Sequence, residues 1–431
     1  MGPAFERSLI NVEDARYTNP LSLKFLDAAA QAGHRHSTDF NDWSATQEGV
    51  GRFQLQTRRG RRHHAASAYL RPAMKRPNLH VECGARVTRL LLDSDKRAVG
   101  VAFTSDASGE VRERVSDGEG EVILCAGAVQ SPQLLMLSGI GGEAELQAHQ
   151  IPQLVDLPGV GRNLQDHPAI VSGYRINAPL SITDEMFLTK GILSPARVAE
   201  WLARGSGPLA TSGCDFGGFF RTRQGMDQPD LQLRFVPGLG TSPDGVGSYR
   251  DIGKSGRTPS GITLQSLAIR PQARGAVTLR SSDPSEPPLI DTGYGSSAED
   301  MATLRAGLRI SKSIAEQPAF GDLLEAEAWP CLDLNDEAAL DDYISNTVHS
   351  GNALAGTCKM GTAAGRDGSA VVDERLNVIG TRGLRVVDAS VIPTMPGGQL
   401  AATVVAMAER AAEMIVAEKA EEAPSMAGQK A

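Results

Sequence analysis

The sequence predicts a mixed α/β and α+β fold divided between two domains, and three observations lead to this expectation. The chain has 431 residues, which is long for one core when a domain averages roughly 150 residues. A strand, a tight Gly/Ala turn and a helix follow one another from Val122 to Gly141, as in an α/β domain. Between residues 169 and 300, short alternating segments separated by Gly, Pro and Asp indicate an antiparallel sheet.

The first half of the chain contains elements with clear end signals. Pro20 suits the first turn of a helix and Gly33 its C-terminal end, so we expect a helix between them. Residues 78–106 alternate like a pair of strands around a turn. Ser131 and Pro132 are expected to open the helix that follows the strand beginning at Val122.

The second half is expected to alternate between sheet and helix. The strands of the antiparallel sheet are expected in the segments GGFFRT, LQLRFVP, ITLQSLAIR and AVTLRS. Helices are expected in PARVAEWLARG, DMATLRAGLRISKSIAEQ and DEAALDDYISNTV. A strand in LRVVDAS then precedes a final helix that ends near residue 417, and the tail 418–431 has the composition of a disordered segment.

Charge and composition argue against several classes of protein. The net charge of −8 disfavours nucleic-acid binding, which needs a concentrated cationic face. The run Arg58, Arg59, Arg61 and Arg62 is a local exception, and such runs usually lie on solvated loops. The cysteines are scattered without a Cys-x-x-Cys pair and the histidines lack metal-ligand spacing, so we expect no disulfide framework and no metal. No apolar run reaches the ~18 residues of a transmembrane helix.

Three motifs, in order along the chain, carry a resemblance to a known family. They are GAVQSPQLLMLSGIG from Gly127, GVGRNLQDHP from Gly159 and LRVVDASVIPTMPGGQ from Leu384. Together they resemble the glucose-methanol-choline (GMC) oxidoreductases, and the resemblance extends from about Asn19 to Ala417. It implies a two-domain flavoprotein that binds FAD, with a Rossmann-like FAD-binding domain and an antiparallel-sheet substrate-binding domain.

The resemblance also implies where FAD would be bound. Val87 would present its backbone to the adenine side, and Asp388 with Ala389 would lie beside the pyrophosphate and the ribityl chain. Gly398 and Gln399 precede the final helix, whose positive N-terminal end would face the pyrimidine ring of the flavin.

One expected feature of the family is absent from this sequence. No G-x-G-x-x-G occurs, because the nearest candidates, at Gly159 and at Gly139, lack the third glycine. We therefore expect an incomplete Rossmann-like domain and a chain that is a piece of a longer protein. Residues 1–168 are assigned to the FAD-binding domain with its lid segment, 169–350 to the substrate-binding domain, and 351–417 to a return to the FAD-binding domain.

The expected reaction depends on two positions where alcohol-oxidising members of the family carry a base. Alignment on Gly356-Thr357-Cys358 puts Ala353 where the family has histidine, and Gln399 replaces the second histidine or asparagine. Neither side chain acts as a base near neutral pH. Neither position therefore supplies a base that could take the proton from an alcohol.

The other polar positions resemble those of the fatty acid photodecarboxylases within this family. The resemblance implies a catalytic set of Cys214, Arg234 and Asn352, and a substrate-binding set that adds Tyr249, Thr263, Gln265 and His349. Such a lyase uses FAD and blue light to convert a long-chain fatty acid into an alkane or alkene and CO2, in the chloroplast. Arg234 would organise the carboxylate, and Cys214 could either pack as a small apolar residue or donate a hydrogen.

Two other hypotheses stay open. A dark flavin oxidoreductase acting on alcohols could use another base, for instance His349, and dye reduction in darkness would favour it. The second alternative is a non-catalytic, lipid-binding protein, which would fit the missing dinucleotide fingerprint. Failure of the purified protein to take up FAD would favour this alternative.

Overall fold

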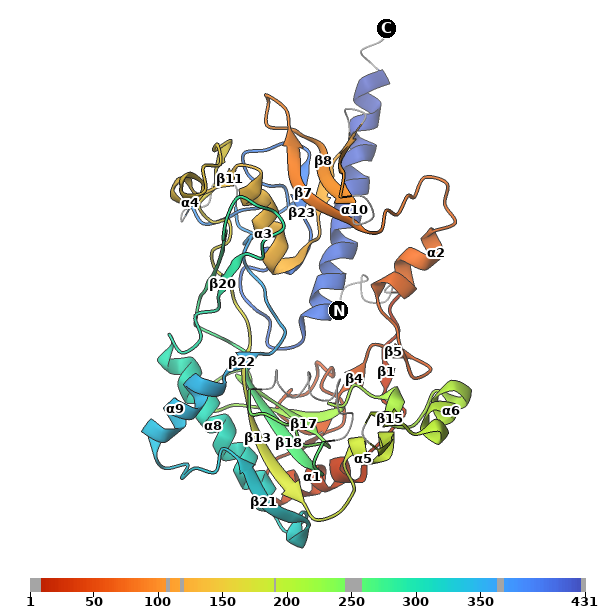
Figure 1. Cartoon of the computed structure of the whole chain (residues 1–431), viewed down its shortest axis with the longest axis vertical. Helices are drawn as coiled ribbons and strands as arrows, with labels where there is room; N and C mark the ends of the chain where they lie inside the picture. Colours follow the sequence, from red (N-terminus) through yellow and green to blue (C-terminus); the bar gives the residue numbers. More distant parts are fainter. Residues whose placement is uncertain are drawn as a thin grey trace.

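The structure, a computed structural model, describes residues 9–105, 109–116, 120–189, 191–244, 258–362 and 368–427. These residues form two lobes that follow one another along the long axis of the molecule (Figure 1). One lobe is built on an eight-stranded sheet, and the other carries small sheets and the long C-terminal helix. The predicted mixed α/β and α+β class is therefore confirmed.

The eight-stranded sheet is antiparallel apart from one parallel pair at its edge, β2 with β3. Its central strands pair over long stretches, with seven register pairs between β13 and β18. In spatial order the strands are β2 (His36–Ser37), β3 (Gly49–Arg52), β16 (Phe216–Phe220), β17 (Leu231–Val236), β18 (Gly261–Ala268), β13 (Pro168–Ile176) and β21 (Leu324–Trp329), and β22 (His349–Ser350) also pairs with β13.

Helices cover one face of this sheet. The main ones are α1 (Pro20–Gln31) and α8 (Ala298–Ala315), with α9 (Glu337–Thr347) packed beside α8. The rings of Phe25 on α1 and Phe235 on β17 stack with centroids 4.6 Å apart, and burying each stabilises the lobe by about 2–3 kcal/mol. Gly307 lets α8 approach the sheet closely, because a Cβ there would lie 2.6 Å from the Cβ of Ser266.

The N-terminal segment belongs to the sheet lobe as well. Pro20 begins α1 as predicted, and the side chain of Asn19 caps the helix by accepting a hydrogen bond from the Leu21 N–H at 2.8 Å. The strands β2 and β3 join the large sheet through β16. The range 1–168, which we assigned to the FAD-binding domain, thus contributes its first part to the other lobe.

One predicted strand of the large sheet lies elsewhere. Residues Ala276–Thr278 form β19, which pairs with β20 (Leu289–Asp291) in a separate hairpin. The N–H of Val277 donates to the carbonyl of Gly161 at 2.7 Å, so the hairpin is held by the other lobe. The prediction was wrong for this segment because alternation identifies a strand without identifying its partner.

The second lobe is assembled from distant parts of the chain. Its parallel pair joins β10 (Val122–Leu124) to β23 (Leu384–Val386), and α10 (Leu400–Ala427) begins at the junction of the lobes and runs away from the sheet (Figure 1). The other main elements are β7 (Ala85–Leu92), β8 (Ala98–Ser105), β9 (Val111–Val115), α3 (Gly127–Leu137) and α4 (Glu143–Ala148). Short elements complete the described chain: β1 (Glu13–Asp14) with β4 (Gln54–Leu55), β5 (Thr57–Arg58) with β6 (Arg61–Arg62), β11 (Ile140–Gly141) with β12 (Val155–Asp156), β14 (Phe187–Thr189) with β15 (Ile192–Leu193), η2 (Ala66–Leu70), α2 (Arg71–Ala73), α5 (Ile182–Met186), α6 (Pro195–Arg204), η3 (Pro208–Ala210), η4 (Gly321–Leu323) and η5 (Ala389–Val391).

Helix α3 begins earlier than predicted, at Gly127 instead of Ser131. Proline inside a helix leaves the carbonyl four residues earlier without its donor. Here that carbonyl belongs to Ala128, and the hydroxyl of Thr357 donates to it at 2.6 Å. The helix therefore tolerates Pro132 in its interior because a residue distant in sequence replaces the missing backbone donor.

Helix α10 continues to Ala427, beyond the predicted end at residue 417. The prediction that residues 418–431 are disordered was therefore wrong for residues 418–427, which belong to α10. Glu418 binds the side chains of Arg375 and Arg385, which ties this part of the helix to the lobe. None of the helices in the described ranges combines the length and apolar character that crossing a bilayer requires.

Candidate functional site

The face of the large sheet opposite α1 and α8 carries a row of polar side chains. On β17, Leu231, Leu233 and Phe235 pack on the helix side, so Arg234 points to the other side. Arg234 is paired in register with Gln265 of β18, which faces Val171 of β13. In Figure 1 this face is turned toward the second lobe.

A chain of hydrogen bonds connects this row to β22. A guanidinium N–H of Arg234 donates to Oε1 of Gln265 at 3.4 Å, and Nε2 of Gln265 lies 3.0 Å from Nε2 of His349. The other ring nitrogen, Nδ1 of His349, lies 3.0 Å from the carbonyl of Thr347 and must donate to it. His349 thus accepts from Gln265 as the Nδ1–H tautomer, and burial lowers the pKa of its imidazole.

Thr263 lies on β18 two residues before Gln265, and therefore on the same face of the sheet. Its hydroxyl donates to the carbonyl of Gly238 at 2.8 Å and accepts from the N–H of Gly240 at 3.4 Å. Thr263 therefore holds the segment that follows β17. Tyr249, the other predicted substrate contact, lies outside the described residues.

Cys214 immediately precedes β16, the neighbour of β17. Burial raises the pKa of its thiol to about 11, and the nearby charge of Arg234 partly offsets this. The carboxylate of Asp215 accepts hydrogen bonds from the hydroxyls of Thr211 and Ser212, which shapes the loop that carries the cysteine. The structure thus brings Cys214 and Arg234 together, and the thiol is neutral near pH 7.

Asn352 follows β22 and has a left-handed backbone with φ of 62°, a conformation that asparagine tolerates better than most residues. Its backbone N–H donates to the Ser350 hydroxyl at 2.9 Å. The carboxylate of Asp166 accepts hydrogen bonds from the Ser350 hydroxyl and from the Ala353 N–H. Asp166 therefore positions the loop that carries Asn352.

Two residues of this region were missed in the sequence, although both lie in the motif GVGRNLQDHP. Besides the contacts above, Asp166 accepts from the hydroxyl of Tyr294 at 2.5 Å. The side chain of His167 is fully buried, and neither ring nitrogen has a hydrogen-bond partner among the described residues. Backbone carbonyls of Pro396 and Ile269 lie near the ring, and burial with the charge of Arg234 lowers the pKa of His167 to about 4.

The two positions of the family's bases differ in their surroundings. Ala353 is buried, and its side chain packs in an apolar cluster with Ala355, Ile392 and Met395. Gln399 is exposed just before α10. Among the described residues at these positions, no side chain can take a proton.

The predicted cofactor residues fall around the start of α10 and the end of β23. Asp388 uses its carboxylate within the protein: Oδ2 accepts from the Gly127 N–H at 2.9 Å and the Ser131 hydroxyl at 2.6 Å. Ala389 follows it in η5, and Val87 lies on β7, which packs against α3. The N-terminus of α3 is therefore capped by Asp388.

The turn before α10 suits an electron-accepting ring that becomes anionic. A Cβ on Gly397 would lie 2.9 Å from the Arg270 guanidinium, whereas Gly398 has open space at the same place. A positive helix N-terminus and a cationic side chain thus flank this turn. These features fit FAD, which Gly398 and Gln399 would meet at its pyrimidine end.

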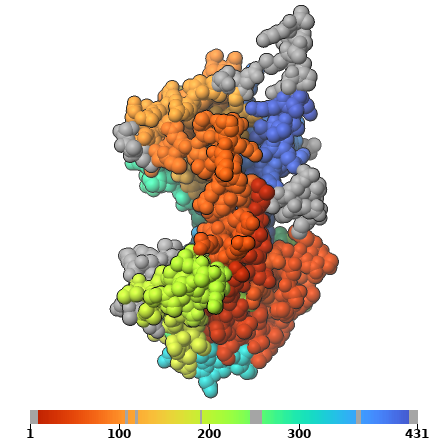
Figure 2. All heavy atoms as spheres, turned by 90° about the vertical axis from the view of Figure 1, so that its right-hand side faces the viewer, coloured from red at the N-terminus to blue at the C-terminus, as the bar shows by residue number. Residues whose placement is uncertain are grey.

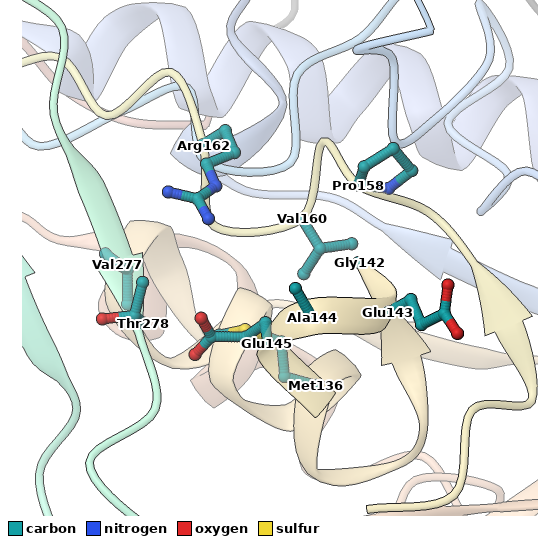
Figure 3. A pocket seen from close by; sticks show the side chains of 10 residues that line it. All are labelled: Met136, Gly142, Glu143, Ala144, Glu145, Pro158, Val160, Arg162, Val277 and Thr278. Atoms are coloured by element: carbon teal, nitrogen blue, oxygen red, sulfur yellow. The ribbon is translucent and has the colours of Figure 1, made fainter. Parts of the chain in front are cut away.

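A separate cavity of about 240 Å³ lies between α3, α4 and β19 (Figure 3). Its lining includes Met136, Val160 and Arg162, and none of the predicted site residues. We assign this cavity no part in the candidate site. No cluster of His, Cys, Asp or Glu side chains in the described ranges is arranged to hold a metal ion.

Two lobes, one with a polar sheet face and the other with a parallel strand pair before a long helix, agree with the two-domain flavoprotein that the sequence predicts. Comparison with known sequences narrows this further. Residues 4–169 and 271–408 match the GMC oxidoreductase family. The chain belongs to the GMC oxidoreductase family, whose cofactor is FAD.

Individual relatives differ in the activity that their names state. The chain is 44% identical to the chloroplastic fatty acid photodecarboxylase of Chlamydomonas reinhardtii over 416 residues, which cover 94% of this chain and 68% of that protein. It is 35% identical to the oxygen-dependent choline dehydrogenase of Brucella anthropi, over 94% of this chain and 70% of the relative. Among solved structures, formate oxidase from Aspergillus oryzae superposes with a TM-score of 0.85 and 26% identity, over 98% of this chain and 75% of that one.

Proposed function

We propose that this protein catalyses the FAD-dependent, blue-light-driven decarboxylation of long-chain fatty acids to alkanes or alkenes and CO2. The observation that carries the proposal is the polar row of Arg234, Gln265 and His349 on the sheet face, combined with an apolar surrounding at Ala353. The identity of 44% to a fatty acid photodecarboxylase supports it. A chloroplast location is proposed on the same relative.

Arg234 is suited to hold a fatty carboxylate. Its guanidinium keeps its charge at every relevant pH, and Gln265 orients it through the 3.4 Å contact with Oε1. His349 in turn orients Gln265, since the Thr347 carbonyl leaves only the Nε2 lone pair to accept. The row therefore presents a cation whose orientation Gln265 and His349 help to hold.

Cys214 and Asn352 would complete the carboxylate end of the site. A thiol whose pKa is about 11 stays protonated near pH 7, so Cys214 neither repels a carboxylate nor acts as a nucleophile. It could donate a hydrogen or pack as a small apolar group. Asn352 would offer its carboxamide N–H to the carboxylate, from a backbone that Asp166 holds through Ser350 and Ala353.

FAD, when bound, would supply the light absorption and the electron acceptance that the reaction needs. Val87, Asp388, Ala389, Gly398 and Gln399 would hold it. Since the light provides the driving force, the protein needs no strong base, and the described site contains none at Ala353 or Gln399.

The test is illumination of the FAD-loaded protein with palmitate, followed by gas chromatography. We expect pentadecane under blue light and none in darkness. FAD shown to be bound by its absorption, with no pentadecane under light, would overturn the proposal. Arg234→Lys should keep the flavin absorption and lose most of the activity, because an ammonium cannot make the planar contacts of a guanidinium.

A dark flavin oxidoreductase is the second candidate, since the relative from Brucella anthropi is named a choline dehydrogenase. His349 could accept a proton because burial keeps it neutral, although Gln265 already uses its Nε2 lone pair. Reduction of a dye by choline or another alcohol in darkness, lost in His349→Gln, would favour this candidate.

A further inference from the structure

The segment that contains β14, β15 and α6 protrudes from the sheet lobe (yellow-green in Figure 2) and carries exposed apolar side chains. Four of these side chains lie on β14, β15 and α6 themselves. Leu188 and Ile192 are each 58% exposed, Leu193 is 41% exposed and Leu202 is 59% exposed. We call these four residues the α6 patch. Exposed apolar side chains are common singly, but a group of four on adjoining elements points to a contact surface.

Helix α6 itself turns an apolar face outward. Ala196, Ala199, Leu202 and Ala203 are all exposed, and their spacing puts them on one side of the helix. The opposite side holds Trp201, which is half-buried. An ordinary surface helix has the reverse arrangement, so the outward face is suited to an apolar environment.

An arginine-rich hairpin is joined firmly to this helix. The indole N–H of Trp201 donates to the Gly60 carbonyl at 3.0 Å, and the Arg61 guanidinium lies 5.0 Å from the centre of the Trp201 ring. A Cβ on Gly60 would lie 1.9 Å from the carbonyl oxygen of Gly205. The hairpin β5–β6 and α6 are thus held together, and in Figure 2 the corresponding segments appear side by side.

The hairpin makes this surface cationic. Arg58, Arg59, Arg61 and Arg62 are all exposed, and none of them forms an ion pair with an acidic residue of the described ranges. Two nearby acids are engaged by another arginine, since Glu185 and Glu200 bind Arg197 at 3.3 and 2.9 Å. Glu13 accepts a hydrogen bond from the Gly60 N–H, so its carboxylate offsets only part of the charge of the four arginines.

We propose that the α6 patch and the arginine hairpin together form a docking surface for a lipid bilayer that carries anionic headgroups. Apolar side chains flanked by unpaired arginines are the features by which a protein lies on such a bilayer without spanning it. The proposed bilayer contact is a property beyond the proposed function. Its purpose, access to fatty acids, rests on that function. Along the chain, α6 is followed by η3 and then by Cys214, so this surface is close in sequence to the candidate site.

The test is flotation of the purified protein with vesicles of phosphatidylcholine alone or with 30% phosphatidylglycerol. We expect binding to the anionic vesicles at low salt and much weaker binding to the neutral ones. Arg58→Gln with Arg62→Gln should weaken binding by roughly 25-fold, since each arginine near an anionic surface contributes about fivefold. Ile192→Ser with Leu202→Ser should weaken it by about tenfold or more.

Matched controls lie on other surfaces of the chain. Arg112→Gln with Arg114→Gln on β9, and Leu289→Ser with Ile290→Ser on β20, remove exposed residues of the same kinds and should leave binding unchanged. Loss of binding in the controls equal to that in the patch variants would overturn the proposal, as would absence of binding by the unmodified protein. A dimer that Leu202→Ser dissociates, without a change in vesicle binding, would identify a second copy as the occupant instead. The assay needs neither flavin nor light, so its outcome is independent of the decarboxylation test.

Discussion

Burial of His167 should make the free energy of unfolding depend on pH between about 4 and 6.5. In the folded protein the pKa of His167 is about 4, against 6.5 for an unperturbed histidine. Since the unfolded chain binds the proton more tightly in this window, stability is complete above pH 6.5 and falls as the pH is lowered toward 4. From these two pKa values, protonation of His167 in the unfolded chain lowers the free energy of unfolding by about 2 kcal/mol between pH 7 and 5. Between pH 7 and 4 it lowers it by about 3 kcal/mol.

The assay is urea unfolding at pH 7, 6, 5 and 4 for the unmodified protein and for His167→Gln. The variant loses stability at every pH because its amide is buried, but its loss between pH 7 and 5 should be smaller by about 2 kcal/mol. His64→Gln replaces an exposed histidine and serves as the control. Equal pH dependence in His167→Gln and the unmodified protein would refute the reasoning.

Three further outcomes follow from contacts in the structure. Thr357→Val should lower the free energy of unfolding by about 1–3 kcal/mol, because it leaves the buried Ala128 carbonyl without a donor; urea unfolding checks this, and Thr357→Ser should restore most of the loss. Asp166→Asn should cost about 2–4 kcal/mol and raise the KM of the proposed reaction, since an amide cannot accept all four hydrogen bonds that the carboxylate receives. Iodoacetamide at pH 8 should modify the exposed Cys83 before Cys214, whose raised pKa keeps the thiol protonated; peptide mapping that finds Cys214 modified first would contradict this.

Local patterns in the sequence were sufficient to predict many of the elements. Pro20 and Gly33 marked the first helix, since their backbone preferences act without help from the rest of the chain. The spacing of two residues between Thr263 and Gln265 predicts that both lie on one face of a strand, because side-chain direction in a strand follows from the period of two. Only the structure pairs Arg234 with Gln265 across two strands. The roles proposed for these residues are open to the experiments above.

Where the sequence-based expectations were wrong, the missing information was a contact with a distant residue. Helix α3 starts before Ser131 because the carboxylate of Asp388 accepts from its first N–H, that of Gly127, and Thr357 compensates for Pro132. No local signal predicts a cap supplied from more than 200 residues away. Likewise, the end of α10 depends on ion pairs of Glu418 with Arg375 and Arg385.

The sequence by itself determined the family and the types of most of its elements, and it predicts that Ala353 and Gln399 replace the family's bases. Motif order and residue chemistry are properties of the chain alone, so they can be read before it folds. Only the tertiary structure decided which strands share a sheet. It also decided that Asp166 orders the loop of Asn352 and that His167 is buried as a neutral ring. These features depend on desolvation and on hydrogen bonds between distant segments, and both exist only once the chain has folded.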